Sequence, residues 1–118
     1  MDDLLFAEEW DLIQLSDDLD FLSIELDNGK GVTATIKFDE HLSYRCRDES
    51  DAGKTLALIR EPGSPGKTLY EVADSDFVKW FTDERGFEFD GAKHFCVSTL
   101  NWVIDIIALK PPDVMRTP

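Results

Sequence analysis

The chain has 118 residues, of which 42% are hydrophobic, and a formal net charge of −13. The length corresponds to one domain, and thirteen aromatic side chains are enough to fill a core, so the composition excludes an intrinsically disordered chain. No apolar run approaches the roughly 20 residues of a membrane-spanning helix, and the first residues are acidic, unlike a secretory signal. We therefore expect a cytoplasmic protein with no membrane partner.

The negative charge is concentrated near the start of the chain. Residues 1–29 hold ten acids and no Lys or Arg, whereas the remainder carries a net charge of only −3. Such a field repels phosphate backbones and favours encounters with basic proteins. We expect a basic protein partner and no nucleic acid, while the alternative is that the acids only keep the protein soluble.

Alternation of apolar and polar residues predicts strands in the first half of the chain. Residues 10–15 are expected to form a strand, and three alternating runs across residues 20–48 predict an antiparallel meander with one solvated face. The run 51–61 is ambiguous between helix and strand, and paired Pro and Gly in residues 61–66 predict a surface loop.

The second half predicts one clear helix. Residues 76–85 have helical spacing, with Ser75 placed to cap the N-terminus and Gly86 to end the helix. Residues 69–73 and two runs within 94–109 are expected to be strands, whereas the tail from Pro111 onward is expected to be irregular. The prediction is a single α+β domain over residues 1–118. It has an antiparallel, possibly mixed, sheet of six or seven strands, with one or two helices packed on one face.

No catalytic or metal-binding motif emerges. The Gly-Lys-Thr triplets at Gly53 and Gly66 lack the glycine that a phosphate-binding loop needs five residues earlier, and the two histidines have no metal-ligand spacing. No motif places a nucleophile beside a base. We expect no catalytic residues, no metal, no cofactor and no enzyme activity, with His41 and His94 structural, and Cys46 and Cys96 buried and reduced.

Surface residues are therefore the best candidates for function. An aromatic side chain ringed by acids is suited to anchor a contact with a basic protein. A tryptophan in the position of Trp10, Trp80 or Trp102 is more often a core residue, and Trp10 is the best candidate for a surface anchor because acids flank it. The predicted partner-binding residues are Glu8, Glu9, Trp10, Asp11, Asp17, Asp18 and Asp20.

Three segments suggest a family resemblance: residues 44–49 (Tyr-Arg-Cys-Arg-Asp-Glu), residues 69–72 (Leu-Tyr-Glu-Val) leading to 77–81 (Phe-Val-Lys-Trp-Phe), and residues 94–97 (His-Phe-Cys-Val) through 104–107 (Ile-Asp-Ile-Ile). Together they resemble small bacterial proteins that include immunity proteins of polymorphic and contact-dependent toxin systems. The resemblance covers most of residues 10–110 at the level of general pattern. It implies a cytoplasmic protein that blocks a toxin domain, often a basic nuclease, and it implies no catalytic residue.

Two alternatives remain open at this point. The chain could be a structural or regulatory interaction module with an unknown partner. It could also be an enzyme or a small-molecule-binding protein that uses a pocket between sheet and helix, lined by Tyr44 and His94. The sequence leaves the oligomeric state open.

Overall fold

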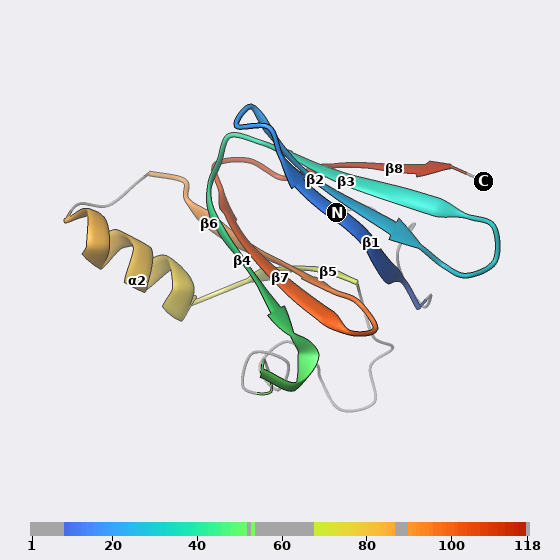
Figure 1. Cartoon of the computed structure of the whole chain (residues 1–118). Coiled ribbons are helices and arrows are strands. Elements are labelled where there is room, and N and C mark those ends of the chain that lie inside the picture. The colour runs from blue at the N-terminus through green and yellow to red at the C-terminus, as the bar shows by residue number, and fades with distance from the viewer. Residues whose placement is uncertain (1–8, 52, 54–67, 87–89, 118) are drawn as a thin grey trace.

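The computed structural model describes residues 9–51, 53, 68–86 and 90–117. Within them, eight strands form two four-stranded antiparallel sheets (Figure 1). The first sheet has the order β1-β2-β3-β8, built from β1 (Asp11–Asp17), β2 (Phe21–Asp27), β3 (Thr33–Asp39) and β8 (Asp113–Thr117). The second has the order β4-β7-β6-β5, built from β4 (His41–Asp48), β7 (Trp102–Ala108), β6 (Lys93–Ser98) and β5 (Leu69–Val72). A 3₁₀ turn (η2, Glu49–Asp51) follows β4, and one α-helix (α2, Asp76–Arg85) follows β5.

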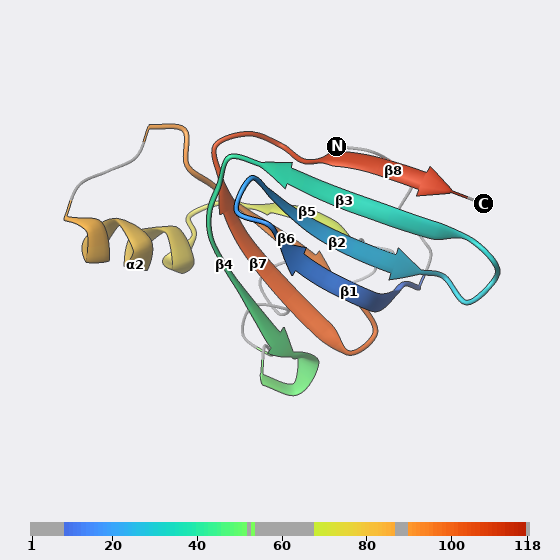
Figure 2. The ribbon, with the colours of Figure 1, turned by 45° about the horizontal axis from the view of Figure 1, so that its top comes forward.

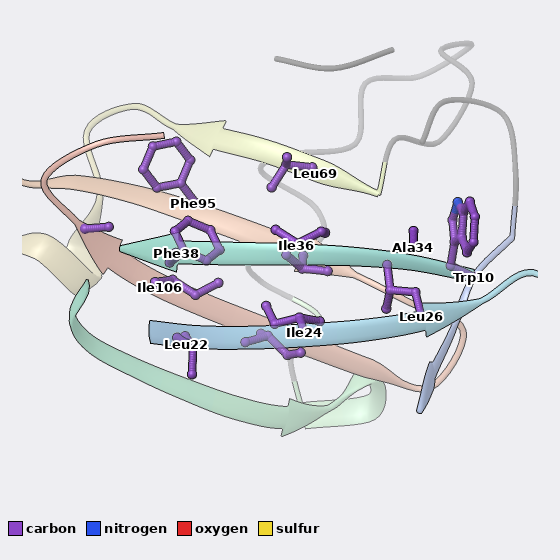
Figure 3. Close-up of a cluster of buried hydrophobic side chains, with 13 residues drawn as sticks. Trp10, Leu22, Ile24, Leu26, Ala34, Ile36, Phe38, Leu69, Phe95 and Ile106 are labelled. Atoms are coloured by element: carbon purple, nitrogen blue, oxygen red, sulfur yellow. The ribbon is translucent and has the colours of Figure 1, made fainter. Parts of the chain in front are cut away.

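The two sheets pack face to face and share one apolar core (Figure 2). Alternate residues of β2 and β3 point inward, and they meet inward residues of β6 and β7, with Phe38 and Phe95 in ring contact at 5.5 Å. Figure 3 shows Phe38, Ile36 and Ala34 spaced along β3, with Trp10 at the far end of the row. The alternation read from the sequence therefore produces a sandwich, because each sheet buries one face against the other.

The α+β class is confirmed, but the expected single sheet of six or seven strands is wrong. There are eight strands in two sheets, and one helix lies among the described residues. The helix projects from the second sheet, and its N-terminal end lies nearest to that sheet (Figure 1). Among the described residues, no helix has the length and apolar character needed to cross a membrane.

The expected three-stranded meander is confirmed for its first two strands and wrong for the third. β2 pairs with β3, but β4 leaves this sheet and pairs with β7 in the other one. Glu40, between β3 and β4, has a left-handed backbone (φ 57°) that redirects the chain, and its carbonyl accepts a hydrogen bond from the Leu109 amide. The free side of β3 is taken by β8.

The tail is the second correction. The two prolines at 111 and 112 interrupt the chain after β7, as expected, but regular structure resumes in β8. β8 pairs with β3 from Thr117 opposite Thr33 to Asp113 opposite Lys37. A proline stops a strand only locally, so the chain can re-enter a sheet wherever an edge is open.

The remaining elements follow the prediction closely. In α2, the Ser75 side chain accepts a hydrogen bond from the Val78 amide at 3.1 Å, and Gly86 ends the helix at φ 84°. The strands expected in residues 69–73 and 94–109 are confirmed as β5, β6 and β7. Most of the ambiguous run 51–61 lies outside the described residues. Cys96 is buried as expected, whereas Cys46 is exposed.

Candidate functional site

The described acids of the base-free opening stretch all belong to the β1–β2 hairpin or its immediate flanks. One group lies at the closed end of the hairpin, and it consists of Asp17, Asp18 and Asp20, which we call the tip acids. The second group lies at the open end, and it consists of Glu9, Asp11, Glu25 and Asp27. The strands between the two ends span about 20 Å, or about two Debye lengths in physiological salt, so each group acts as a separate negative patch.

Three of the open-end acids, Asp11, Glu25 and Asp27, share one face of the sheet. Asp11 lies directly opposite Asp27 across the strand pair, and opposite residues of an antiparallel pair point to the same side. Glu25, two residues before Asp27, points the same way. Within the described part of the chain, no Lys or Arg forms a salt bridge with either acid group. The hairpin therefore presents negative charge that the protein itself does not neutralise with these bases.

The tip acids also build the turn in which they lie. Asp17 Oδ1 accepts a hydrogen bond from the Leu19 amide at 2.8 Å. Asp18 Oδ1 accepts from the amides of Asp20 and Phe21 at 3.0 and 2.7 Å. Asp and Asn favour turns for this reason, since a side-chain oxygen replaces a backbone acceptor. The turn is thus held by the same carboxylates that give it its charge.

Asp17 is further fixed from the second sheet. His41 Nε2, on β4, lies 3.0 Å from Asp17 Oδ1. The hydrogen bond from the Leu19 amide is the main cause that lowers the pKa of Asp17. Desolvation opposes it, and the contact with His41 lowers the pKa further. Asp17 is therefore ionised at neutral pH and acts only as an acceptor, so His41 donates from Nε2.

Leu19 is the exposed apolar residue between the tip acids. It is 87% exposed and has a left-handed backbone with φ 79°. A non-glycine residue in this conformation costs about 1–2 kcal/mol relative to the ordinary right-handed regions. Leu19 is therefore an exposed leucine in a strained backbone conformation, and three carboxylates surround it. Ile13, at a bulge in the edge strand β1 and 54% exposed, adds a second apolar side chain to the same hairpin.

Trp10 does not lie on this surface. Its side chain is 1% exposed and belongs to the shared core, so its expected role as a surface anchor is wrong. The reason is non-local: the Trp10 carbonyl accepts a hydrogen bond from the Leu100 amide, which ties the residue to the loop between β6 and β7. Of the other expected partner-binding residues, Glu8 lies outside the described residues. Glu9, Asp11, Asp17, Asp18 and Asp20 are exposed.

The other two tryptophans were expected in the core and instead reach the solvent. Trp80 on α2 is 53% exposed and stacks on Phe77, and Trp102 at the start of β7 is 39% exposed. The helical spacing of Phe77 and Trp80 correctly indicates one shared face. However, only Phe77 is buried against the sheet.

A buried polar cluster on the outer face of the second sheet was not foreseen. The carboxylate of Asp105, on β7, is fully buried, and three side chains bind it. Its Oδ2 accepts hydrogen bonds from Arg45 Nε at 2.8 Å and Arg47 Nη2 at 2.7 Å, and its Oδ1 lies 2.6 Å from His94 Nε2. Burial raises the pKa of Asp105, but hydrogen bonds from His94 and Arg45 outweigh it and hold the pKa well below its ordinary value.

Ser75 completes this cluster. Its Oγ lies 2.6 Å from His94 Nδ1, and the Phe77 ring meets His94 edge-on at 5.5 Å while the Arg45 guanidinium lies 4.2 Å above the Phe77 ring centre. The polar residues come from the start of α2 and from β4, β6 and β7. One sequence signal was available, since a lone Asp within the apolar run 102–108 indicates a buried carboxylate with partners.

Comparisons of the chain with protein-family models, with curated proteins and with solved structures find no match.

Proposed function

We propose that the chain is a binding protein whose β1–β2 hairpin docks on a basic protein and covers a cationic site of that partner, as an immunity protein does with a toxin domain. The observation that carries this proposal is the tip of the hairpin. There, exposed Leu19 is surrounded by Asp17, Asp18 and Asp20, none of which is in a salt bridge with a described Lys or Arg.

The hairpin has the two features that such a contact needs. Unneutralised carboxylates attract a cationic surface from a distance and speed the encounter. An exposed apolar side chain then gives a short-range contact that excludes water around the charge pairs. Leu19 takes the anchoring role that the sequence suggested for Trp10, because Trp10 is buried.

The backbone of the tip is already ordered for binding. Asp17 and Asp18 fix the amides of residues 19, 20 and 21 by hydrogen bonds, so little conformational entropy is lost when a partner docks. The strain at Leu19 supports the proposal, since strained residues persist where surrounding structure or function requires them.

The proposal is tested with an oligolysine peptide as the cationic probe and a charge-matched pair of double variants. Asp18→Asn with Asp20→Asn removes two tip charges, and Asn retains the side-chain oxygen that holds the turn. Asp83→Asn with Glu84→Gln removes two exposed charges from α2. Calorimetric titration at low salt and at about 0.5 M salt measures the affinity, because salt at the higher concentration screens exposed charges.

We expect the tip variant to lose most of the salt-sensitive affinity and the α2 variant to retain it. Equal losses in the two variants would show that the peptide responds to net charge alone, and the proposal would be wrong. If the gene beside that of this chain encodes a secreted protein with a cationic C-terminal domain, that domain is the partner to test next against the same two variants.

A further inference from the structure

The buried cluster on the second sheet contains a serine, a histidine and an aspartate in one hydrogen-bonded line. Ser75 Oγ lies 2.6 Å from His94 Nδ1, and His94 Nε2 lies 2.6 Å from Asp105 Oδ1. Ser75 comes directly before α2, while His94 and Asp105 lie on the neighbouring strands β6 and β7. The docking proposed above does not involve any of these three residues, since the hairpin belongs to the other sheet.

The proton positions in this line follow from the ionisation of Asp105. Its carboxylate is deprotonated at neutral pH and can only accept, so in neutral His94 the Nε2 atom carries the hydrogen. Nδ1 is then an acceptor, and the Ser75 hydroxyl donates to it. A serine that donates to a neutral imidazole, itself oriented by a carboxylate, is the arrangement that activates a serine nucleophile.

We propose that Ser75 is a nucleophile activated by His94 and Asp105, and that this site cleaves small carboxylic esters.

The backbone around Ser75 fits this role. The serine follows a short strand and precedes a helix, and Asp74 before it has a left-handed backbone with φ 49°. First-turn amides of a helix have no partner within the helix. The amides of Asp76 and Phe77 are therefore the donors available to an oxyanion formed beside Ser75.

The reaction proceeds in two steps, acylation of Ser75 and hydrolysis of the acyl-serine. Ser75 Oγ attacks the ester carbonyl carbon as its proton passes to His94 Nδ1, and the imidazolium is stabilised by Asp105. The tetrahedral adduct then collapses, so the bond to the alkoxy oxygen breaks and the alcohol leaves with the proton from Nδ1. Water attacks the acyl-serine with the same proton transfer, which releases the carboxylic acid and restores Ser75. Ser75 is only 8% exposed, so access to its Oγ is narrow, and the proposal is confined to small esters.

The same serine also caps α2, because its Oγ accepts a hydrogen bond from the Val78 amide at 3.1 Å. A capping role and a nucleophilic role are separated by Ser75→Asn, since Asn is an equally good cap and has no hydroxyl. Ser98 on β6 is an internal comparison, because it is also 8% exposed.

The wild-type protein is treated with a fluorophosphonate, the modified serine is identified by peptide mass spectrometry, and hydrolysis of p-nitrophenyl acetate is measured in parallel. We expect labelling of Ser75 and not of Ser98. Ester turnover should fall to the rate of the uncatalysed background in Ser75→Asn, and labelling of Ser75 should be about 100-fold slower in His94→Gln. Circular dichroism confirms that each variant is folded.

Three outcomes would overturn the proposal. The first is no labelling of Ser75 above Ser98 in the folded wild-type protein. The second is ester turnover in folded Ser75→Asn equal to that of wild type. The third is labelling of Ser75 at an unchanged rate in folded His94→Gln. The wild-type labelling decides the question even if a variant does not fold. Because the hairpin is untouched in all these variants, the outcome is independent of peptide binding at the tip.

Discussion

His41 Nε2 on β4 donates a hydrogen bond to Asp17 Oδ1 on β1 at 3.0 Å, and this bond joins the two sheets at one edge of the sandwich. The same Oδ1 accepts from the Leu19 amide. The conformation of the hairpin tip is therefore coupled to the second sheet through a single carboxylate. Within the described residues, His41 Nδ1 is buried and has no hydrogen-bond partner, so the Nε2 contact is the polar contact that orients the ring.

Stability should depend on the ionisation of Asp17. Its pKa is lower in the folded protein than its ordinary value of 3.8, so the stabilisation is fully present above that value and is lost as the pH falls through the folded-state pKa. We expect Asp17→Asn to unfold at lower urea than wild type at neutral pH, and the two curves to converge under strongly acidic conditions. Urea titrations over this pH range measure the difference.

Asp11→Asn is the matched control for this experiment. Asp11 lies on the same strand, opposite Asp27, and like charges at opposite positions repel. We expect this variant to be at least as stable as wild type at neutral pH. A loss of stability equal to that of Asp17→Asn would show that His41 and Leu19 do not account for the effect.

Leu19→Asn should make the protein more stable. Asn tolerates the left-handed conformation better than Leu, and a side chain that is 87% exposed has little packing to lose. We expect a gain of about 0.5–1 kcal/mol in the free energy of unfolding, measured with urea, together with weaker binding of a basic protein partner. Lower stability in this variant would mean that the leucine is held by packing, and its proposed anchoring role would lose its support.

Trp10→Ala should strongly destabilise the fold. The side chain is 1% exposed and packs in the shared core, and truncation of a buried Trp costs about 3–5 kcal/mol. Trp80→Ala, with a side chain that is 53% exposed, should cost much less. Thermal unfolding of the two variants makes the comparison. A larger loss of stability in Trp80→Ala than in Trp10→Ala would contradict the burial of Trp10 in the core.

Asp105→Asn should strongly destabilise the second sheet. It removes the charge that three side chains share and leaves two guanidinium groups without their buried carboxylate, at a cost of about 3–5 kcal/mol. The exposed acid Asp90 serves as the control, since surface substitutions such as Asp90→Asn change stability by within about 0.5 kcal/mol. A loss below 1 kcal/mol in Asp105→Asn, within the range of exposed ion pairs, would contradict the geometry of the cluster.

Local patterns predicted the elements well and their assembly poorly. Strict alternation placed β2 and β3, and the capping residue Ser75 with Gly86 placed α2, because these features depend on neighbours in the chain. The departure of β4 to the second sheet and the return of β8 depend on which sheet edges are open. No local pattern contains that information.

In the candidate site, too, local features were predicted from the sequence and contacts between distant residues were not. The acidic stretch was visible in the sequence, and the structure places its described acids on one hairpin. In contrast, the burial of Trp10 depends on a contact with Leu100, far along the chain. The partners of Asp105 on β4 lie 60 and 58 residues away, so sequence spacing could not reveal the cluster. The alternation of Arg45 and Arg47 showed only that both point to one face.

We propose that a cationic partner binds at the hairpin tip. The most direct measurement is a titration of ¹⁵N-labelled protein with an oligolysine peptide, followed by amide chemical shifts at low salt. We predict that the largest shifts fall on residues 17–21 and disappear at about 0.5 M salt, where the Debye length is below about 5 Å. Shifts spread evenly over all exposed acids, or largest on α2, would contradict the claim.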